Sequence, residues 1–389
     1  MSPPLDLTPV DKLEVLILVD NFVEWFSTLP PEFTHELPQH LASPDVPKDS
    51  LTGLPIMDFD NYCCGAHGLS ILIKTTIGEN TYSVLLDSGP EPKTIERNVA
   101  AMSVDLTQLD AVVLSHWHRD HSGGIVRVLE LRQAQQAQQA QQERQERQGQ
   151  AKLKIDLHPS RPIRRGIARR PNPEPFCNLP ADPSFDEIKA AGGEIDLHDE
   201  PHEIVVCSTS EGGGKKTGVG VSGEIKRVVD YEKGVLGGVR WEKDESTGEE
   251  GWFTDTMIMD ERYVVVDVKG KGLVVFSSCS HAGISNVITS LLPLSRPIHA
   301  LIAGLHLVPT SHQPARETID FITSRVQPRP RWVVPLHCTG LEARGWLRER
   351  LGEGCVLGGV GVRGVFGGGR GGEGEGEGHG EEEGFKIVD

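Results

Sequence analysis

Short apolar runs separated by polar or glycine-containing turns recur along the first half of the chain. Such runs, rich in branched apolar residues and bounded by turn residues, are typical of buried strands. They lie at 13–19, 69–73, 82–86, 111–114, 153–157 and 204–206. The second and third flank a turn at 78–80, which predicts paired strands, and the apolar stretch 125–131 after the fourth can start a helix.

The second half contains four more runs, and their ends share one feature. The runs lie at 263–268, 272–276, 300–304 and 332–336. Lys269-Gly270-Lys271 between the first two is a strong hairpin signal. The last three lead to His281, His306 and His337, just as the early run 111–114 leads to His116. This repetition predicts that the histidines share one edge of the sheets.

Three segments lack such a pattern. Residues 30–55 are Pro-rich and polar, and we expect a long loop that either covers a pocket or is mobile. The Gln-rich stretch 133–150 has no apolar face, so we expect an insertion that is either a solvated helical extension or disordered. Residues 368–389 are dominated by Gly and Glu, which predicts a disordered tail. The remainder of 1–367 is expected to form one domain.

Four metal-binding side chains fall within six residues after the run 111–114. They are His116, His118, Asp120 and His121, and Gly123-Gly124 follow them. Zinc takes imidazole nitrogen and carboxylate oxygen. His116 and His118 can converge on one ion, while Asp120 and His121 can reach a second ion, about 3.5–4 Å away in two-metal sites. The alternative is a polar surface loop that happens to hold three histidines, and the strand of buried type before it disfavours that alternative.

The spacing His-x-His-x-Asp-His at 116–121 resembles the metal motif of the metallo-β-lactamase superfamily. The resemblance implies an α+β fold, a four-layer αββα sandwich with metals at one edge of two packed sheets. Further segments, from about residue 15 to about residue 359, resemble one branch, the 7,8-dihydropterin-6-methyl-4-(β-D-ribofuranosyl)-aminobenzene-5'-phosphate synthase group. These segments are Leu18-Val19-Asp20-Asn21, His67-Gly68-Leu69-Ser70, Leu85-Leu86-Asp87-Ser88-Gly89, Cys279-Ser280-His281-Ala282-Gly283-Ile284, Gly304-Leu305-His306-Leu307 and His337-Cys338-Thr339-Gly340.

The resemblance also implies roles for single residues. The predicted metal ligands are His116, His118, Asp120, His121, His281 and His337, with Asp120 also catalytic. Asp87 is expected to hold loop backbone or orient a ligand histidine, although an ordinary turn is the alternative. His306 is either a ligand, a proton carrier or a supporting residue. Cys279 is either a soft ligand or, more often for such a residue, a small core side chain.

Other polar residues stay open at this point. Asn21 either lies near the site or caps a turn, and His67 either contacts substrate or makes a structural hydrogen bond. The arginines between 161 and 170 either meet a phosphate or carboxylate of a substrate or form a solvated patch. The remaining histidines, typical of surface or hydrogen-bonded core positions, are His158, His198, His202, His299, His312 and His379.

Composition limits the partners. The net charge of -17 argues against nucleic acid, because phosphate backbones are bound by clustered Lys and Arg. A cationic metal centre still favours a small anionic substrate. Seven scattered cysteines without a basic leader predict reduced thiols and a cytoplasmic location. No run approaches the roughly 20 apolar residues that span a membrane. Oligomeric state is not predicted.

Three functions follow from these residues. The first is a hydrolase in which a metal-bound hydroxide attacks an ester, phosphate ester or lactone. The second, implied by the branch, is a transferase that moves a pterin-methyl group from its diphosphate to an aromatic ribose phosphate. The third is a binding or scaffold protein without productive metal, which the complete motif disfavours. The expected cofactor is Zn²⁺, one or two ions, while iron, manganese and nickel also suit imidazole ligands.

Overall fold

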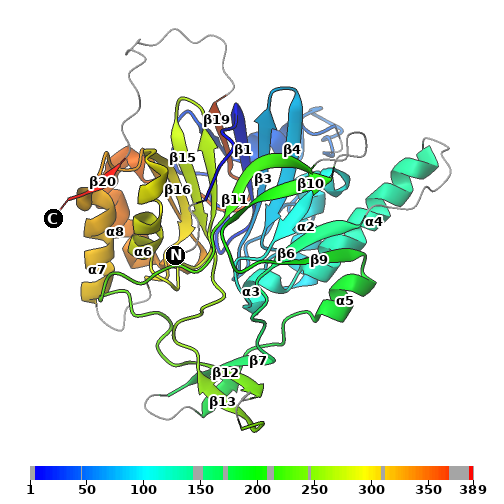
Figure 1. Ribbon diagram of the computed structural model, residues 1–389. Coiled ribbons are helices and arrows are strands. Elements are labelled where there is room, and N and C mark those ends of the chain that lie inside the picture. Colours follow the sequence, from blue (N-terminus) through cyan, green and yellow to red (C-terminus); the bar gives the residue numbers. More distant parts are fainter. Residues whose placement is uncertain are drawn as a thin grey trace.

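The computed structural model describes residues 5–44, 46–142, 152–169, 174–207, 214–243, 247–307, 312–367 and 385–388. Two β-sheets pack face to face in this part of the chain, and helices cover the outer face of each sheet (Figure 1). The layers are therefore helix, sheet, sheet, helix, and the expected α+β sandwich of the αββα type is confirmed.

The first sheet has eight strands in the described residues, in the order β2-β19-β1-β3-β4-β5-β6-β9. Their bounds are Lys12–Val19 for β1, Phe33–Thr34 for β2, Ser70–Ile77 for β3, Asn80–Leu86 for β4, Ala111–Val113 for β5, Leu153–Leu157 for β6, Gly193–Leu197 for β9 and Arg363–Gly367 for β19. The predicted pair β3 and β4 is antiparallel, whereas β4, β5, β6 and β9 run parallel.

The second sheet has six described strands, in the order β10-β11-β14-β15-β16-β18. Their bounds are His202–Cys207 for β10, Gly214–Val221 for β11, Val264–Val268 for β14, Gly272–Ser277 for β15, Ile298–Gly304 for β16 and Trp332–Leu336 for β18. The predicted hairpin is β14 and β15. Strands β15, β16 and β18 are parallel, so the histidines that follow them emerge at the same edge.

Helices on the outer faces close two further apolar layers. The helices α2 (Pro92–Ala101), α4 (Ile125–Gln142) and α5 (Phe185–Ala190) cover the first sheet, and α6 (Ile284–Ser290), α7 (His312–Asp320) and α8 (Leu341–Leu351) cover the second (Figure 1). Fully buried aliphatic side chains such as Ile71 and Val266 fill the space between the sheets. At ~25 cal/mol per Å² of apolar surface, these layers supply the main driving force for folding.

Short helical segments and a small strand pair complete the described elements. The shorter helices are α1 (Leu37–Ala42), α3 (Arg119–Ser122), η1 (Leu106–Gln108), η2 (Leu292–Leu294), η3 (Phe321–Arg325), η4 (His337–Thr339) and η5 (Gly352–Gly354). The strand pair is β17 (Val326–Gln327) with β20 (Lys386–Ile387). No helix of the described residues is long and apolar enough to cross a membrane.

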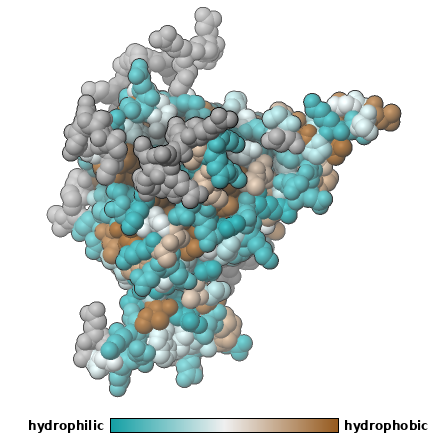
Figure 2. All heavy atoms as spheres, turned by 90° about the vertical axis from the view of Figure 1, so that its right-hand side faces the viewer, coloured by the Kyte–Doolittle hydropathy of each residue, from teal (hydrophilic) through white to brown (hydrophobic). Residues whose placement is uncertain are grey.

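A separate four-stranded sheet was not predicted. It has the order β13-β12-β7-β8 and consists of β7 (Arg164–Ala168), β8 (Pro175–Asn178), β12 (Gly238–Lys243) and β13 (Glu250–Thr254). This small sheet extends from the sandwich at the lower end of Figure 1, and Figure 2 shows it protruding there with a mostly hydrophilic surface.

The Pro-rich segment 30–55 is not the extended loop that its composition predicts. It contains β2, which pairs with β19, and helix α1. Phe33 is buried and packs edge-on against Trp332 and Phe366. The nearby carboxylate of Glu32 accepts hydrogen bonds from the rings of Trp332 and His299. The segment is thus fastened across the edges of both sheets.

The Gln-rich stretch begins inside helix α4, which continues through Gln142 (Figure 1). Gln135 holds the turn before η1, because its Oε1 accepts from the Leu106 N–H at 2.7 Å and its Nε2 donates to the Val104 carbonyl at 3.0 Å. The stretch is helical up to residue 142, and residues 143–150 lie outside the described part. The tail predicted at 368–389 also lies outside it except at 385–388, where Phe385 is buried and β20 pairs with β17.

Candidate metal centre

The predicted metal loop leaves β5 and passes over a buried support. Asp87, at the end of β4, accepts the Ser115 N–H at 2.8 Å and so fixes the first residue of the loop. Gly123 and Gly124 close the loop because nothing larger fits: an added Cβ would lie 1.9 Å from the Pro90 carbonyl oxygen and 2.2 Å from that of Ser88. The two glycines permit a close approach of backbones, and this holds the loop against the end of β4.

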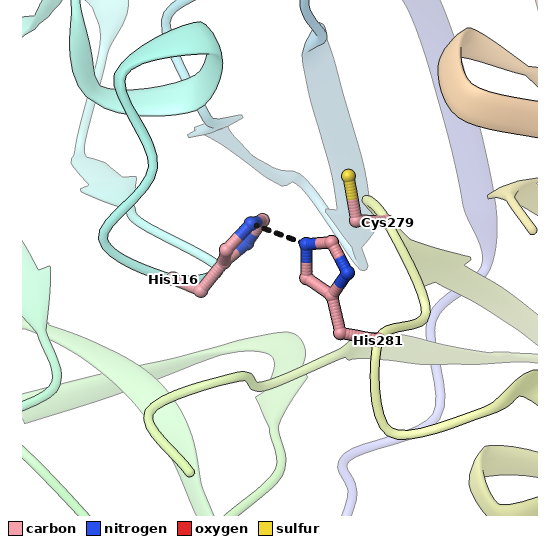
Figure 3. Close-up of side chains that lie close together, drawn as sticks. All are labelled: His116, Cys279 and His281. Atoms are coloured by element: carbon pink, nitrogen blue, oxygen red, sulfur yellow. Dashed lines mark hydrogen bonds between the residues drawn. The ribbon is translucent and has the colours of Figure 1, made fainter. Parts of the chain in front are cut away.

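Three imidazole nitrogens converge at the edge between the sheets. His116 Nε2 lies 2.9 Å from His118 Nδ1, and His281 Nε2 lies 3.2 Å from each of them. Figure 3 shows that the rings of His116 and His281 face each other from opposite sides of the site. Nitrogens that bind one zinc ion tetrahedrally at 2.0–2.1 Å are about 3.3 Å apart. These three nitrogens therefore fit one ion, and they are called the first ligand group below.

A second set of donors lies beside the first. Asp120 Oδ2 is 3.3 Å from His337 Nε2 and 3.7 Å from His121 Nε2. His337 Nε2 is buried and has no hydrogen-bond partner among the described residues. A lone pair that faces a carboxylate without a proton or partner is unfavourable unless a cation lies between them. Asp120, His121 and His337, the second ligand group, thus fit a second metal ion.

Cys279 lies between the two groups. Its Sγ is 3.2 Å from His121 Nε2, and its sulfur falls within 4.8 Å of donor atoms of both groups. The thiol is almost fully buried, and burial raises its pKa well above the usual value, with Cys338 and the carboxylate of Asp120 acting in the same direction. Without a metal, Cys279 is therefore a neutral thiol. Next to a metal ion its sulfur is placed as a soft ligand.

Asp87 sets the proton positions of two of these histidines. Its Oδ2 accepts from His121 Nδ1 at 2.8 Å and from the Ser115 hydroxyl at 2.8 Å. The same Ser115 hydroxyl, its proton committed to Asp87, accepts from His116 Nδ1 at 2.9 Å. Because a neutral imidazole has one N–H, Nε2 of His116 keeps a lone pair directed into the site, and Nε2 of His121 does so once that ring is neutral, as a metal ligand must be. The structure is consistent with both supporting roles expected for Asp87.

The charges of the site match ligand chemistry. Burial lowers the pKa of His118 to about 3 and that of His337 to about 4, and it holds the pKa of His116 and His281 well below the usual range. Burial alone would raise the pKa of Asp120, but His121 and His337 lower it far below its usual value, so the carboxylate is ionised.

His121 differs from the other site histidines in its charge. Burial would lower its pKa, yet Asp120 and Asp87 raise it to about 9. The metal-free site therefore holds a proton where the second cation would bind.

The structure brings together all six predicted metal ligands, with Asp87 and Cys279 against them. His306 stands next to His281, with ring centroids 4.5 Å apart, but it belongs to neither ligand group among the described residues. Asp156, His198 and His202 form another close set at the sheet edges. There the ring centroids of His198 and His202 lie 4.0 Å apart and the rings stack, so their lone pairs are parallel and do not converge as those of the ligand groups do. His198 pairs with Asp196, and His202 pairs with Asp156.

The described arginines between 161 and 170 do not share one role, because Arg164 and Arg169 are exposed, as in a solvated patch, whereas Arg165 is structural. Arg165 is buried and pairs with Asp255 at 2.7 Å and with Asp260, while it also donates to the Trp117 carbonyl inside the metal loop. The same Asp260 accepts the Trp117 N–H at 2.7 Å. Neither a substrate-facing nor a solvated cluster describes Arg165. Instead the small sheet contributes the guanidinium of Arg165, which holds the backbone of the metal loop at Trp117.

Sequence patterns left several supporting residues unassigned. Glu261, at the turn before β14, accepts the backbone N–H groups of His281 and Ala282 and thereby fixes the loop after β15. Burial raises the pKa of Glu261 to about 7. Asn21 and His67, for which two roles stayed open, lie directly beside His337. The closeness of His67 to the metal motif has a signal in the sequence only through the resemblance noted above.

Comparison with known proteins shows what the chain is similar to. Residues 66–203 match the family model described as the metallo-beta-lactamase superfamily. The chain is 24% identical over 295 residues to 7,8-dihydropterin-6-methyl-4-(beta-D-ribofuranosyl)-aminobenzene-5'-phosphate synthase of Methanocaldococcus jannaschii, which covers 74% of this chain and 85% of that protein. It is 23% identical over 277 residues to the uncharacterized protein MJ0448 of the same organism, covering 71% and 85% respectively.

A solved structure supports the same fold. Tm1679, described as a metal-dependent hydrolase of the beta-lactamase superfamily, superposes with a TM-score of 0.56 at 17% identity, over 90% of this chain and 98% of Tm1679. This likeness concerns the arrangement of sheets and helices, since so low an identity does not carry function across.

Proposed function

We propose that this chain, whose residues 66–203 match the model of the metallo-beta-lactamase superfamily, is a metal-dependent hydrolase that acts on an ester, a phosphate ester or a lactone. Two divalent ions, zinc in our proposal, are held by the two ligand groups. His116, His118 and His281 hold the first ion, and Asp120, His121 and His337 hold the second, with Cys279 beside both.

The convergence of three imidazole nitrogens from buried, neutral histidines is the observation that carries this proposal. Three nitrogens lie within 2.9–3.2 Å of one another, and the hydrogen bond at Nδ1 of His116 turns its Nε2 lone pair into the site. Such a set of lone pairs without protons is unfavourable unless cations bind to it. When bound, divalent ions acidify water and neutralise the charge that develops on a substrate oxygen.

The chain's own residues then position the reacting groups. Asp120 is the ionised carboxylate of the site, and about a quarter of its side chain is exposed. Its low pKa makes Asp120 a weak general base, so its carboxylate serves as a hydrogen-bond acceptor that orients the attacking water. A cationic centre in an otherwise acidic protein favours a small anionic substrate.

A second candidate is transfer rather than hydrolysis. The relative that is named a synthase is matched over 85% of its length, which favours a related reaction on a pterin diphosphate and an aromatic ribose phosphate. In that case the same ions would neutralise the leaving diphosphate, and an aromatic nucleophile would take the place of water. The two reactions place the same demands on the ligand groups, so a choice between them requires a measurement.

The experiment begins with metal content. Purified protein is stripped with a chelator, reloaded with zinc, iron, manganese or nickel, and analysed by mass spectrometry beside His116→Ala and the control His158→Ala, whose imidazole lies outside both ligand groups. Each loaded form is then assayed on phosphodiester, lactone and thioester substrates and on the transferase pair. We expect His116→Ala to lose metal and activity and the control to keep both. A parent protein that cannot be loaded with any of these metals would contradict the proposal.

A further inference from the structure

The loop that carries His67 is fastened on both sides. The Ala66 N–H donates to the Asp20 carbonyl at 2.9 Å, and the Leu69 N–H donates to the Asp120 carbonyl at 3.3 Å. Gly68 lies so close to the metal loop that an added Cβ would be 2.4 Å from the Asp120 carbonyl oxygen. Direct contacts between the backbone of its own loop and that of the metal loop therefore position His67.

The amide of Asn21 determines which nitrogen of His67 bears the proton. Asn21 Oδ1 accepts from the Gly68 N–H at 3.4 Å and from His337 Nδ1 at 3.0 Å, and this fixes the orientation of the amide. Asn21 Nδ2 then lies 3.1 Å from His67 Nδ1. An amide NH₂ only donates, so Nδ1 of a neutral His67 accepts and the N–H lies on Nε2.

One amide thus gives two neighbouring histidines opposite tautomers. His337 carries its proton on Nδ1 and presents a lone pair at Nε2, as a metal ligand requires. His67 presents an Nε2–H instead, which donates and, while it keeps this proton, does not bind a metal ion, although donor atoms of His67, Asp120 and His337 lie within 4.8 Å of one another. The Nε2 of His67 is 3.6 Å from Asp120 Oδ2, beyond the distance of a hydrogen bond.

Exposure separates His67 from the ligands in the same way. Its side chain is 71% exposed, whereas those of His121 and His337 are fully buried. The ring of His67 lies 4.8 Å from that of His337, so it stands at the solvent side of the second ligand group. A fixed N–H donor at the open side of a cationic site is placed to meet a substrate oxygen.

We propose that His67 is a substrate-contacting residue that donates its Nε2–H to an anionic oxygen of the substrate above the second ligand group, and that Asn21 is the positioning residue that fixes this tautomer. This inference rests on the proposed function for the presence of a substrate at this edge. The tautomer of His67 and the hydrogen bond that it donates can both be measured without assaying turnover.

The first test compares metal content and tautomer. Zinc-loaded parent, His67→Ala and His67→Gln should contain equal zinc, whereas His337→Ala should contain less. Nitrogen-15 spectra of histidine side chains in the loaded parent should place the His67 proton on Nε2, with the signal assigned by its loss in His67→Gln. In Asn21→Asp the proton should move to Nδ1, because a carboxylate accepts and cannot donate. Loss of zinc in His67→Ala would show that His67 is a metal ligand and would overturn the proposal. A proton on Nδ1 of His67 in the parent would refute the proposed tautomer.

The second test uses inorganic phosphate as the probe. Calorimetric titration of the zinc-loaded proteins should show phosphate binding about ten-fold weaker in His67→Ala, the loss of one hydrogen bond to a charged group. His67→Gln keeps an N–H donor and should recover most of that loss. Phosphate affinity that is equal in His67→Ala and the parent, or absent from the loaded parent, would overturn the contact. A protein that binds zinc and phosphate but cleaves none of the tested substrates would refute hydrolysis and leave the role of His67 intact.

Discussion

The exchange of Asp87 for asparagine tests how the site is organised. The fully buried carboxylate accepts three hydrogen bonds of 2.8 Å, from the Ser115 N–H, the Ser115 hydroxyl and His121 Nδ1. The side chain introduced by Asp87→Asn is of equal size, but if its amide oxygen keeps the Ser115 N–H, its NH₂ faces His121 Nδ1. His121 must then carry its proton on Nε2 and point an N–H at the second ion.

The expected magnitude follows from the role of such supporting partners. Their loss typically weakens metal binding by about 10- to 100-fold. Since each factor of ten corresponds to about 1.4 kcal/mol, saturating zinc should stabilise Asp87→Asn by about 1.4–2.8 kcal/mol less than it stabilises the parent. Comparing metal-free and zinc-loaded forms of each protein separates this effect from any general loss of stability.

Zinc affinity is measured by competition with a chromophoric chelator, and thermal unfolding is followed with and without zinc. Asp105→Asn is the matched control, because its carboxylate caps η1 by accepting the Thr107 N–H at 2.9 Å, away from the site. The control should keep parental zinc affinity. If Asp87→Asn also binds zinc as tightly as the parent, the metal site does not depend on the tautomer that Asp87 imposes, and our reasoning is refuted.

Three further predictions concern separate parts of the molecule. Asp120→Asn should lower turnover by at least about 10²-fold while the first ligand group keeps its metal, as assayed by kinetics and metal stoichiometry; near-parental turnover would contradict the role of the carboxylate. Gln135→Ala should lower the free energy of unfolding in urea by about 1–3 kcal/mol, because two backbone groups before η1 lose their partner, while the exposed control Gln138→Ala should not. Burial would raise the pKa of Glu32, but hydrogen bonds, first that of His299, lower it from 4.5 to about 2. This stabilisation is therefore present above pH 4.5 and is lost as the pH falls toward 2. Glu32→Gln should be less stable than the parent at pH 7 and should lose less stability than the parent between pH 4.5 and pH 2. If urea unfolding shows the same pH dependence for both proteins, this prediction is refuted.

Sequence patterns predicted the strands and the shared edge of histidines because the evidence for both is local, whereas the sandwich followed from the resemblance of the metal motif. Apolar runs mark the strands, and a histidine after each parallel strand necessarily reaches a common edge. The small sheet escaped prediction since its pairing strands, 164–168 and 238–243, are far apart and carry arginine, glycine and tryptophan in place of an alternating apolar pattern. Arg165 shows the same limit: an arginine is buried here only because Asp255 and Asp260 meet it from distant positions.

Two features of the N-terminal part of the chain, strand β2 and the pair Asn21 and His67, escaped prediction for a related reason. Prolines around Phe33 obscure a strand of two residues whose burial depends on Trp332 and Phe366. Asn21 and His67 are 46 positions apart, and their shared hydrogen bond appears only once the first strands lie against the metal loop. Residues that act through partners far away in the sequence require the folded arrangement to be recognised.

The first ligand group joins two residues that are 165 positions apart, and this has a consequence for synthesis of the chain. His116 and His118 leave the ribosome early, while His281 follows only after the second sheet has been largely translated. At about 5–20 residues per second, the early pair waits on the order of 10–30 s for its third partner. A nascent chain therefore carries an incomplete chelator, and firm metal capture coincides with docking of the two sheets. In our proposal, metal in the first ligand group thereby reports that His281 has docked against the metal loop, and truncated chains that end before His281 should be recovered without tightly bound metal.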